Sequence, residues 1–479
     1  MKESKGIVSM KHELKVGDFV EWKSEGARAK GSILKKISTP MKFKTYTVHA
    51  SKGKPQFFIK REKTGLVVLH KGTALKWIGE KEGETQNRPA PTRSTKPDKN
   101  KIEKQKVKIN RLRELEVFGQ SVWMDFIRRK MIVSGELKRL IAEDGLGGVT
   151  SNPSIFEKAI AENSDYDTAI HKLALRGKTP DQIYTALTVG DIQDAADLFR
   201  PLYDRLNGAD GFVSLEVSPH LARDTHGTIL EARRLWAAVD RPNVLIKVPG
   251  TKEGLPAIRQ LIGEGINVNV TLLFGLPRYG EVAEAYIAGL ETLVAQGKPL
   301  KSATSVASFF LSRIDVLVDP MLEKEMKKDK SKADLAKSLH GQVAILSAKA
   351  AYQIYEEIFN DDRFVKLQAQ GAKSQRLLWA STSTKNPAYS DLKYVDSLIG
   401  PETINTIPME TLAAYRDHGK PGYRLSRDGM RAPQMLRRLP EVGIDLDAVT
   451  QQLEDEGVQK FTKAFDVLMD ALRKKRSQL

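Results

Sequence analysis

The stretch NVLIKVP, residues 243–249, has the composition of a buried β-strand but carries a lysine in its middle. Its aliphatic and β-branched residues follow Arg-Pro and end at Pro-Gly, which favours a short strand bounded by turns. Lys247 is unusual there, because lysine is rarely buried without a partner and its charge is costly inside a protein. The stretch therefore predicts a buried strand and leaves the presence of an amine to be explained.

Strand-like runs recur on both sides of this stretch, and helical patterns separate them. The other runs lie at 121–126, 148–152, 211–217, 266–273, 304–310, 376–381 and 404–407. Amphipathic helices are predicted between them, for example at 180–189 and 191–206. Eight strands separated by helices indicate an α/β fold, a (β/α)8 TIM barrel over residues 108–479, with room for extra helices. A doubly wound sheet is the alternative, but no G-x-G-x-x-G follows a strand, so a dinucleotide fold gains no support.

The first part of the chain has a different pattern. Short β signals at 18–22, 31–34, 45–48, 56–59 and 65–69 predict a small all-β barrel domain over residues 13–79. Residues 80–107 contain almost nothing to bury and are dominated by Pro, Thr, Lys and Glu, which predicts a charged flexible linker. Three zones therefore follow one another, and the largest is the TIM barrel.

Composition limits the class of protein. The 479 residues are 41% hydrophobic and 29% charged, which is enough for a large core. There is no cysteine, so disulfides, thiolate catalysis and thiolate metal sites are excluded. The N-terminus lacks an apolar segment and no run of about 18 apolar residues occurs, so we expect a cytoplasmic protein without a membrane span.

The net charge of +17 is concentrated in the first quarter of the chain. Residues 1–107 hold 26 Lys and Arg against 11 Asp and Glu, whereas residues 108–479 hold the other 51 against 49. The lysines of residues 1–107 are interleaved with aromatic residues, namely Trp22, Tyr46, Phe57 and Phe58. These could form a nucleic-acid surface, or the aromatics could be the core of the small domain. We expect weak polyanion contact through residues 1–107 rather than sequence recognition.

Polar side chains recur at the C-terminal ends of the predicted barrel strands, where TIM barrels carry their active sites. In chain order they are Asp125, Thr150 and Asn152, Glu216, Lys247, Asn269 and Thr271, Ser308 and Arg313, and Lys385. Any single one has an ordinary structural explanation, such as a helix cap or a lysine that faces water. Their repetition on seven consecutive strands predicts one functional site at the mouth of the barrel.

The chemistry of an amine in this position explains the lysine. An apolar strand disfavours the charged form of an amine, and a neutral amine forms Schiff bases with carbonyl substrates. The iminium is an electron sink, so an adjacent carbon–carbon bond can break. Such a reaction needs a carboxylate to move protons, and Asp125 and Glu216 are candidates. No His cluster or carboxylate triad shows clear ligand spacing, so a metal-dependent enolate mechanism is disfavoured and no metal site is predicted.

Residues 108–479 also resemble a known family, the transaldolases, and specifically their longer bacterial subfamily. The matching runs follow the family's order along nearly the whole zone. They are FGQSVWMDFIRR, GVTSNPSIFEKAI, DIQDAADLFRPLYD, GFVSLEVSPHLARDT, RPNVLIKVPGTKEG, INVNVTLLF, SVASFFLSRID and LLWASTSTKNPAYSD. The resemblance implies a (β/α)8 barrel whose fourth strand carries the Schiff-base lysine, here Lys247.

The resemblance implies roles for the other residues too. Asp125 would be the acid and base at the C3–C4 bond, and Glu216 would relay protons through a water held by Thr271. Asn152 and Asn269 would bind hydroxyls of the dihydroxyacetone unit, in a pocket shaped by Thr150 and Ser308. Arg313 would bind phosphate, for which bidentate pairing gives a physical reason. Lys385 stands where shorter relatives have a second phosphate-binding arginine, and Ser383 stands where a glycine is expected.

The implied reaction is the transfer of dihydroxyacetone from sedoheptulose 7-phosphate to glyceraldehyde 3-phosphate in the pentose phosphate pathway. It gives erythrose 4-phosphate and fructose 6-phosphate and needs no cofactor, because the lysine supplies the electron sink. Two alternatives stay open, a Schiff-base fructose 6-phosphate aldolase and a polyanion-binding scaffold with an idle barrel. The first zone resembles the hypervirulence-associated Tudor-like domain, which supplies no catalytic residues. The sequence predicts no oligomeric state.

Overall fold

The computed structural model describes residues 13–24, 27–38, 41–43, 46–48, 50–51, 53–62, 67–80, 110–425 and 431–477. The chain divides into two compact units, Met1–Ile109 and Asn110–Leu479. The linker predicted at 80–107 lies outside the described residues apart from its first position. In the part of the chain that is described, no helix has the length and apolar character needed to cross a membrane.

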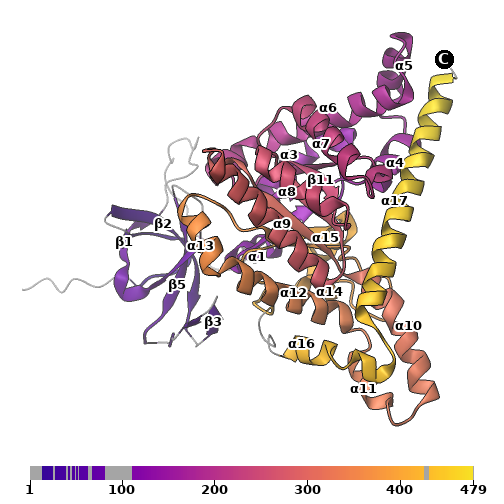
Figure 1. Ribbon diagram of the computed structural model, residues 1–479. Helices are drawn as coiled ribbons and strands as arrows, with labels where there is room; N and C mark the ends of the chain where they lie inside the picture. The colour runs from indigo at the N-terminus through magenta and orange to yellow at the C-terminus, as the bar shows by residue number, and fades with distance from the viewer. Residues whose placement is uncertain are drawn as a thin grey trace, which may run out of the picture. The chain divides into compact units, whose positions relative to one another are not determined.

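The first unit is built on an antiparallel sheet (Figure 1). Its strands are β1 (Asp18–Ser24), β2 (Ala27–Ile37), β5 (Gln56–Arg61), β6 (Val67–Lys71) and β7 (Lys76–Glu80), in the order β6-β5-β2-β1-β7, beside a hairpin of β3 (Met41–Phe43) and β4 (Tyr46–Val48). The small all-β class is confirmed, although the described strands form an open sheet because β6 and β7 do not pair with each other. The strands β3 and β7 were not predicted.

The aromatic residues of this unit lie in its core. Trp22, Phe57 and Phe58 have at most 3% of their surface exposed, and Trp22 and Phe57 pack in one cluster with Val20 and Ile33. This burial favours the core interpretation over an exposed aromatic surface for nucleic acid. The side chain of Tyr46, the fourth aromatic in that prediction, lies outside the described part.

The second unit is a closed barrel of eight parallel strands, which confirms the predicted TIM-barrel class. The strands are β8 (Gln120–Met124), β9 (Gly148–Val149), β10 (Phe212–Glu216), β11 (Val244–Pro249), β12 (Val268–Leu273), β13 (Ser305–Phe310), β14 (Arg376–Ala380) and β15 (Thr403–Ile407). Their order around the barrel is β10-β11-β12-β13-β14-β15-β8-β9. The strand that contains Lys247 is therefore flanked by β10 and β12, which carry Glu216 and Asn269.

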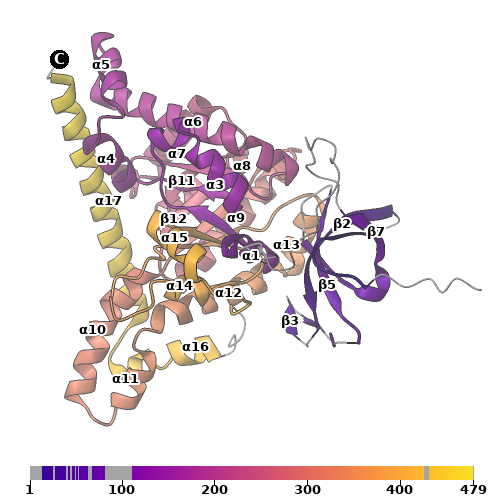
Figure 2. The ribbon, with the colours of Figure 1, turned by 180° about the vertical axis from the view of Figure 1, so that it is seen from behind.

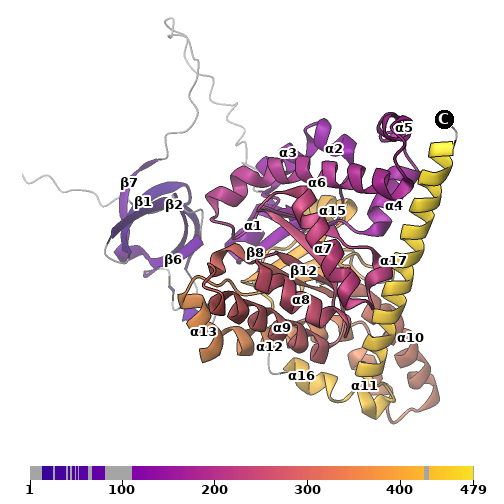
Figure 3. The same ribbon diagram turned by 45° about the horizontal axis from the view of Figure 1, so that its top comes forward.

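Helices surround the strands on all sides (Figures 1 and 2). They are α1 (Arg111–Val117), α2 (Arg129–Val133), α3 (Glu136–Asp144), α4 (Pro153–Ala161), α5 (Asp167–Leu175), α6 (Pro180–Arg205), α7 (Thr225–Val239), α8 (Gly254–Glu264), α9 (Leu276–Ala295), α10 (Ser312–Lys328), α11 (Ala333–Leu339), α12 (Val343–Phe359), α13 (Asp362–Ala369), α14 (Lys393–Asp396), α15 (Met409–His418), α16 (Arg431–Leu436) and α17 (Leu446–Ser477). The last helix, α17, runs along one side of the barrel unit (Figure 3) and packs against α4, α6 and α10.

One predicted break in a helix is absent. The patterns at 180–189 and 191–206 predict two helices, but α6 runs without interruption through Gly190. A glycine inside a helix costs only about 1 kcal/mol relative to alanine. Burial of the neighbouring Val189 and Asp191 and a capping box between Thr179 and Gln182 favour one long helix.

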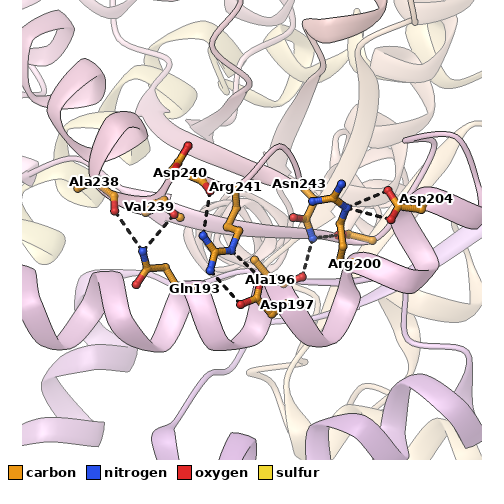
Figure 4. A network of polar contacts seen from close by, with 11 residues as sticks. Gln193, Ala196, Asp197, Arg200, Asp204, Ala238, Val239, Asp240, Arg241 and Asn243 are labelled. Atoms are coloured by element: carbon orange, nitrogen blue, oxygen red, sulfur yellow. Dashed lines mark hydrogen bonds and ion pairs between the residues drawn. The ribbon is translucent and has the colours of Figure 1, made fainter.

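Polar contacts, most of them with α6, hold the beginning of β11 in place (Figure 4). The Asn243 Nδ2 group donates hydrogen bonds to the carbonyl oxygens of Ala196, at 2.8 Å, and Gly211, at 3.0 Å. Arg241 donates two hydrogen bonds to the carboxylate of Asp197. Because Asn243 is fully buried and enters the strand four residues before Lys247, these contacts fix the depth at which the lysine sits in the barrel.

Candidate active site

Lys247 and Glu216 face each other inside the barrel. Strands β10 and β11 are parallel neighbours in a register that sets these two residues side by side. The Lys247 Nζ lies 3.1 Å from Glu216 Oε2 and donates a hydrogen bond of 3.0 Å to the carbonyl oxygen of Ser151. Both side chains are almost fully buried, with 5% and 4% of their surface exposed. The lysine in the middle of the strand therefore has the partner that burial demands.

Glu216 is a carboxylate with little else to hold it. Apart from the ion pair with Lys247, no hydrogen-bond partner for its two oxygens occurs among the described residues. Burial raises the pKa of Glu216, the charge of Lys247 lowers this pKa, and the nearby Asp125 raises it further. A carboxyl group whose pKa lies above the ordinary range can take up and return a proton near neutral pH.

Asp125 follows β8 and lies in a short chain of hydroxyl groups. The Thr150 Oγ1 donates a hydrogen bond of 2.7 Å to Asp125 Oδ1 and lies 2.8 Å from Thr406 Oγ1. Because a hydroxyl has one proton to donate, Thr406 must be the donor to Thr150. Burial raises the pKa of Asp125, while the charge of Lys247 and the hydrogen bond from Thr150 lower it.

Thr406 was not among the predicted site residues. It comes from TINTI, residues 403–407, which forms the eighth strand of the barrel. The other polar residues were located as polar side chains near the ends of strands. The same criterion, applied to this strand, identifies Thr406. Thr406 does not contact the reacting centre directly but orients the hydroxyl that holds Asp125.

Asn269 is held by hydroxyl groups from the strands around it. Ser308 of β13 donates a hydrogen bond of 2.7 Å to Asn269 Oδ1, and Asn269 Nδ2 donates one of 3.0 Å to Ser214 Oγ. Asn269 is also in register with Lys247. The amide is therefore fixed beside the amine, with its orientation set by two serines, of which Ser214 was not predicted.

Thr271 lies two residues further along β12 and is fully buried. Its Oγ1 has no hydrogen-bond partner within the described ranges, and a buried hydroxyl of this kind is a typical site for an ordered water. The next residue, Leu272, has a φ of 59°, and the pairing with β13 shifts in register here. A leucine rarely adopts this conformation, so backbone strain is stored directly beside Thr271.

Asn152 has a structural task as well as the predicted one. It is the N-cap of α4, and its Oδ1 accepts a hydrogen bond of 3.0 Å from the backbone N–H of Ile155. The cap uses the oxygen of the amide, so the NH2 group is the part that a ligand could use. The residue is half-buried at the C-terminal side of β9.

The two predicted phosphate ligands lie after neighbouring strands. Arg313 lies in the first turn of α10, with its guanidinium 5.6 Å from the centre of the Phe310 ring, and burial lowers its pKa. Lys385 lies in the loop after β14 and is exposed, and its Nζ donates a hydrogen bond of 2.7 Å to Ser383 Oγ. The serine that replaces the expected glycine thus holds the lysine.

The site combines an amine, two carboxyl groups and a set of hydroxyl and amide groups at one end of the barrel. No group of three or more His, Cys, Asp or Glu side chains that could hold a metal occurs in the described part of the chain. The arrangement is suited to nucleophilic attack by an amine on a carbonyl carbon, with proton transfer by carboxyl groups whose pKa is raised by burial.

Comparison with known proteins identifies two related families. A family model described as Transaldolase/Fructose-6-phosphate aldolase matches residues 122–472, and one described as Hypervirulence associated proteins TUDOR domain matches residues 17–75. A protein named Transaldolase from Trichodesmium erythraeum is 48% identical over 374 residues, which are 77% of this chain and 98% of the relative. Transaldolase 2 from a Nostoc species is 48% identical over 372 residues, with the same two shares. Transaldolase from Saccharopolyspora erythraea is 47% identical over 368 residues, again 77% and 98%.

Proposed function

We propose that Lys247 is the amine that carries the transferred sugar fragment. The chain belongs to the transaldolase family. The chain is an enzyme of the transferase class, and its activity is that of a transaldolase. The reaction moves a dihydroxyacetone unit from sedoheptulose 7-phosphate to glyceraldehyde 3-phosphate and so belongs to the pentose phosphate pathway. The observation that supports Lys247 best is its buried position 3.1 Å from Glu216.

The first step is attack of the Lys247 amine on the ketone carbon of the donor sugar. The carbinolamine that forms loses one water to give an iminium, and hydrolysis of the iminium at the end of the cycle consumes one water. Both steps need a proton carrier beside the amine. Glu216 is in contact with Lys247 and has a raised pKa. Thr271, whose Oγ1 has no hydrogen-bond partner among the described residues, would hold the water involved.

Carbon–carbon cleavage needs a base at the neighbouring hydroxyl. Asp125 removes the proton from the C4 hydroxyl as the C3–C4 bond breaks, and the bonding electrons move into the iminium to give an enamine. The aldose leaves, and the enamine then adds to the aldehyde of the acceptor while Asp125 returns the proton. The raised pKa of Asp125 supports this role, because a base with a pKa close to the working pH can serve in both directions.

The remaining residues bind the sugar. Asn152 and Asn269 hold hydroxyl groups of the three-carbon unit, and Thr150 and Ser308 orient the groups around it. Arg313 and Lys385 bind the phosphate, which needs cations on the side of the site away from the amine. The hydrogen bonds around Asn269 and Thr150 support a pocket that is organised before the substrate enters.

A coupled assay separates this function from its closest alternative, an aldolase that releases dihydroxyacetone. Release of glyceraldehyde 3-phosphate from fructose 6-phosphate is measured with and without erythrose 4-phosphate. We expect turnover only when the acceptor is present. Equal rates without the acceptor would establish an aldolase, and no release in either assay would overturn the proposed function.

A further inference from the structure

The C-terminal helix α17 lies directly against the proposed phosphate ligand. Gly457 of α17 is buried, and a Cβ atom placed on it would lie 3.6 Å from Arg313 Nη1 and 3.1 Å from Leu272 Cδ2. There is little room for a side chain at this point, so the helix backbone approaches both Arg313 and the strained end of β12. A helix that packs this closely can contribute its own side chains to the mouth of the barrel.

Lys460 is a cationic side chain of α17 close to this contact. It lies three residues after Gly457, which puts the two on the same face of the helix. The lysine is exposed, and within the described ranges it forms no hydrogen bond or ion pair through its side chain. It is therefore a cation without a partner among the described residues, next to a site that must bind an anion.

The charged groups that shift the pKa of Lys460 are other cations. Its pKa is lowered, first by the charge of Arg313, then by partial burial, and then by Lys385 and Lys158. Among the described carboxylates none pairs with Lys460, whereas Asp125 and Glu456 act on Arg313. Like charges that lie close together repel one another, so an anion bound between Arg313, Lys385 and Lys460 stabilises the arrangement.

We propose that Lys460 is a further phosphate-binding residue, which α17 brings to the barrel mouth beside Arg313 and Lys385. It would make the site selective for phosphorylated sugars over their unphosphorylated counterparts. This inference rests on the proposed function, because it names a ligand of the same site. No strand end pointed to Lys460, since it lies far beyond the last barrel strand in the sequence.

The test compares Lys460→Gln with Lys460→Arg and with a matched control, Lys474→Gln. Lys474 is an exposed lysine on the same helix, about 21 Å further along its axis at 1.5 Å per residue. For each variant we measure kcat and KM for fructose 6-phosphate, and the affinity for inorganic phosphate by titration calorimetry. Arg313→Ala serves as the positive control for loss of phosphate binding, and thermal unfolding checks that each variant is folded.

We expect Lys460→Gln to raise KM and weaken phosphate binding by roughly tenfold, the effect of losing one charge-assisted hydrogen bond. Lys460→Arg should stay within about twofold of the wild type, since it keeps the charge, and Lys474→Gln should behave as the wild type. Identical constants for Lys460→Gln and Lys474→Gln would overturn the inference. An inactive wild type would refute the proposed function. Calorimetry needs no turnover, so the phosphate affinities of the variants would still test the role of Lys460.

Discussion

At the scale of single residues, Lys247 can occupy a buried strand because Glu216 lies opposite it on the neighbouring strand. Neither side chain has much other support, since Lys247 has one backbone carbonyl and Glu216 has no further partner in the described structure. Removal of either one would leave a buried charge without compensation, which costs several kcal/mol in most proteins. Such a pair contributes little to the free energy of unfolding but is well suited to proton transfer.

The hydrogen bond from Thr150 to Asp125 leads to a prediction about pH dependence. Asp125 acts as a base only when it is deprotonated, and burial raises its pKa while Thr150 lowers it. Thr150→Val removes the lowering contribution, so the acidic limb of the kcat/KM profile should move to higher pH. Thr406→Val keeps the bond to Asp125 and should give a smaller shift. A profile of Thr150→Val that moves to lower pH, or does not move, would contradict Asp125 as the base.

Most of the site's residues could be predicted from the sequence because one rule, a polar group at the end of a barrel strand, places them. The rule cannot say what the groups do to one another. Asn152 also caps a helix and Ser383 binds Lys385, and both facts follow from loop conformations that local sequence does not determine. The rule does not apply to Lys460, because this residue lies on the long helix α17 and not at the end of a strand.

At the scale of secondary structure, the strand prediction succeeded where an apolar run ended in a clear turn. The run at 148–152 extends furthest beyond its strand, because β9 ends at Val149. Asn152 caps α4 and Pro153 begins it, so the chain has to leave the sheet before the predicted end. In the first unit β2 extends over Ala27–Ile37, well beyond the predicted 31–34. The added residues of β2 are mostly polar, and their backbone pairs with β1 and β5.

The contacts that hold β11 lead to a prediction about stability. Asn243 is buried and donates two hydrogen bonds to backbone oxygens, so Asn243→Ala should lower the free energy of unfolding by about 1–3 kcal/mol. Arg200 on α6 pairs with Asp204 in an exposed position, and Arg200→Ala should cost less than about 0.5 kcal/mol. Chemical denaturation measures both. Equal losses would mean that Asn243 does not hold the strand.

At the scale of the whole molecule, the barrel unit corresponds to a complete transaldolase. The relatives are covered over 98% of their own length by 77% of this chain. In the remaining part, residues 17–75 match the Tudor-domain family model, and this match contains the strands of the antiparallel sheet except β7. The charge and strand patterns of the sequence predict a change of character near residue 108. The cytoplasmic location remains a prediction from the sequence.

Deletion of residues 1–107 tests how far the two units are independent. We expect the remaining fragment to keep kcat and KM within about twofold of the full chain, because relatives of that extent carry the name transaldolase. Limited proteolysis should cut first between 80 and 107 and release an active fragment. An inactive deletion variant that is still folded would show that the first unit contributes to catalysis.

The basic charge of residues 1–107 leads to a separate prediction for polyanions. Because the excess charge lies there and the aromatic residues Trp22, Phe57 and Phe58 are buried, we expect weak binding to nucleic acid without sequence preference. A mobility shift should weaken steeply as salt rises and disappear when residues 1–107 are deleted. Binding that survives 0.5 M salt, or that distinguishes sequences, would contradict this expectation.

The most direct test of the account is to trap the covalent intermediate on Lys247. The full-length enzyme is incubated with fructose 6-phosphate, reduced with borohydride, digested and analysed by mass spectrometry. We predict one modified peptide, in which Lys247 carries a reduced three-carbon unit, and no modification in Lys247→Ala. A modified peptide that contains a different lysine, or labelling that persists in Lys247→Ala, would contradict the central claim.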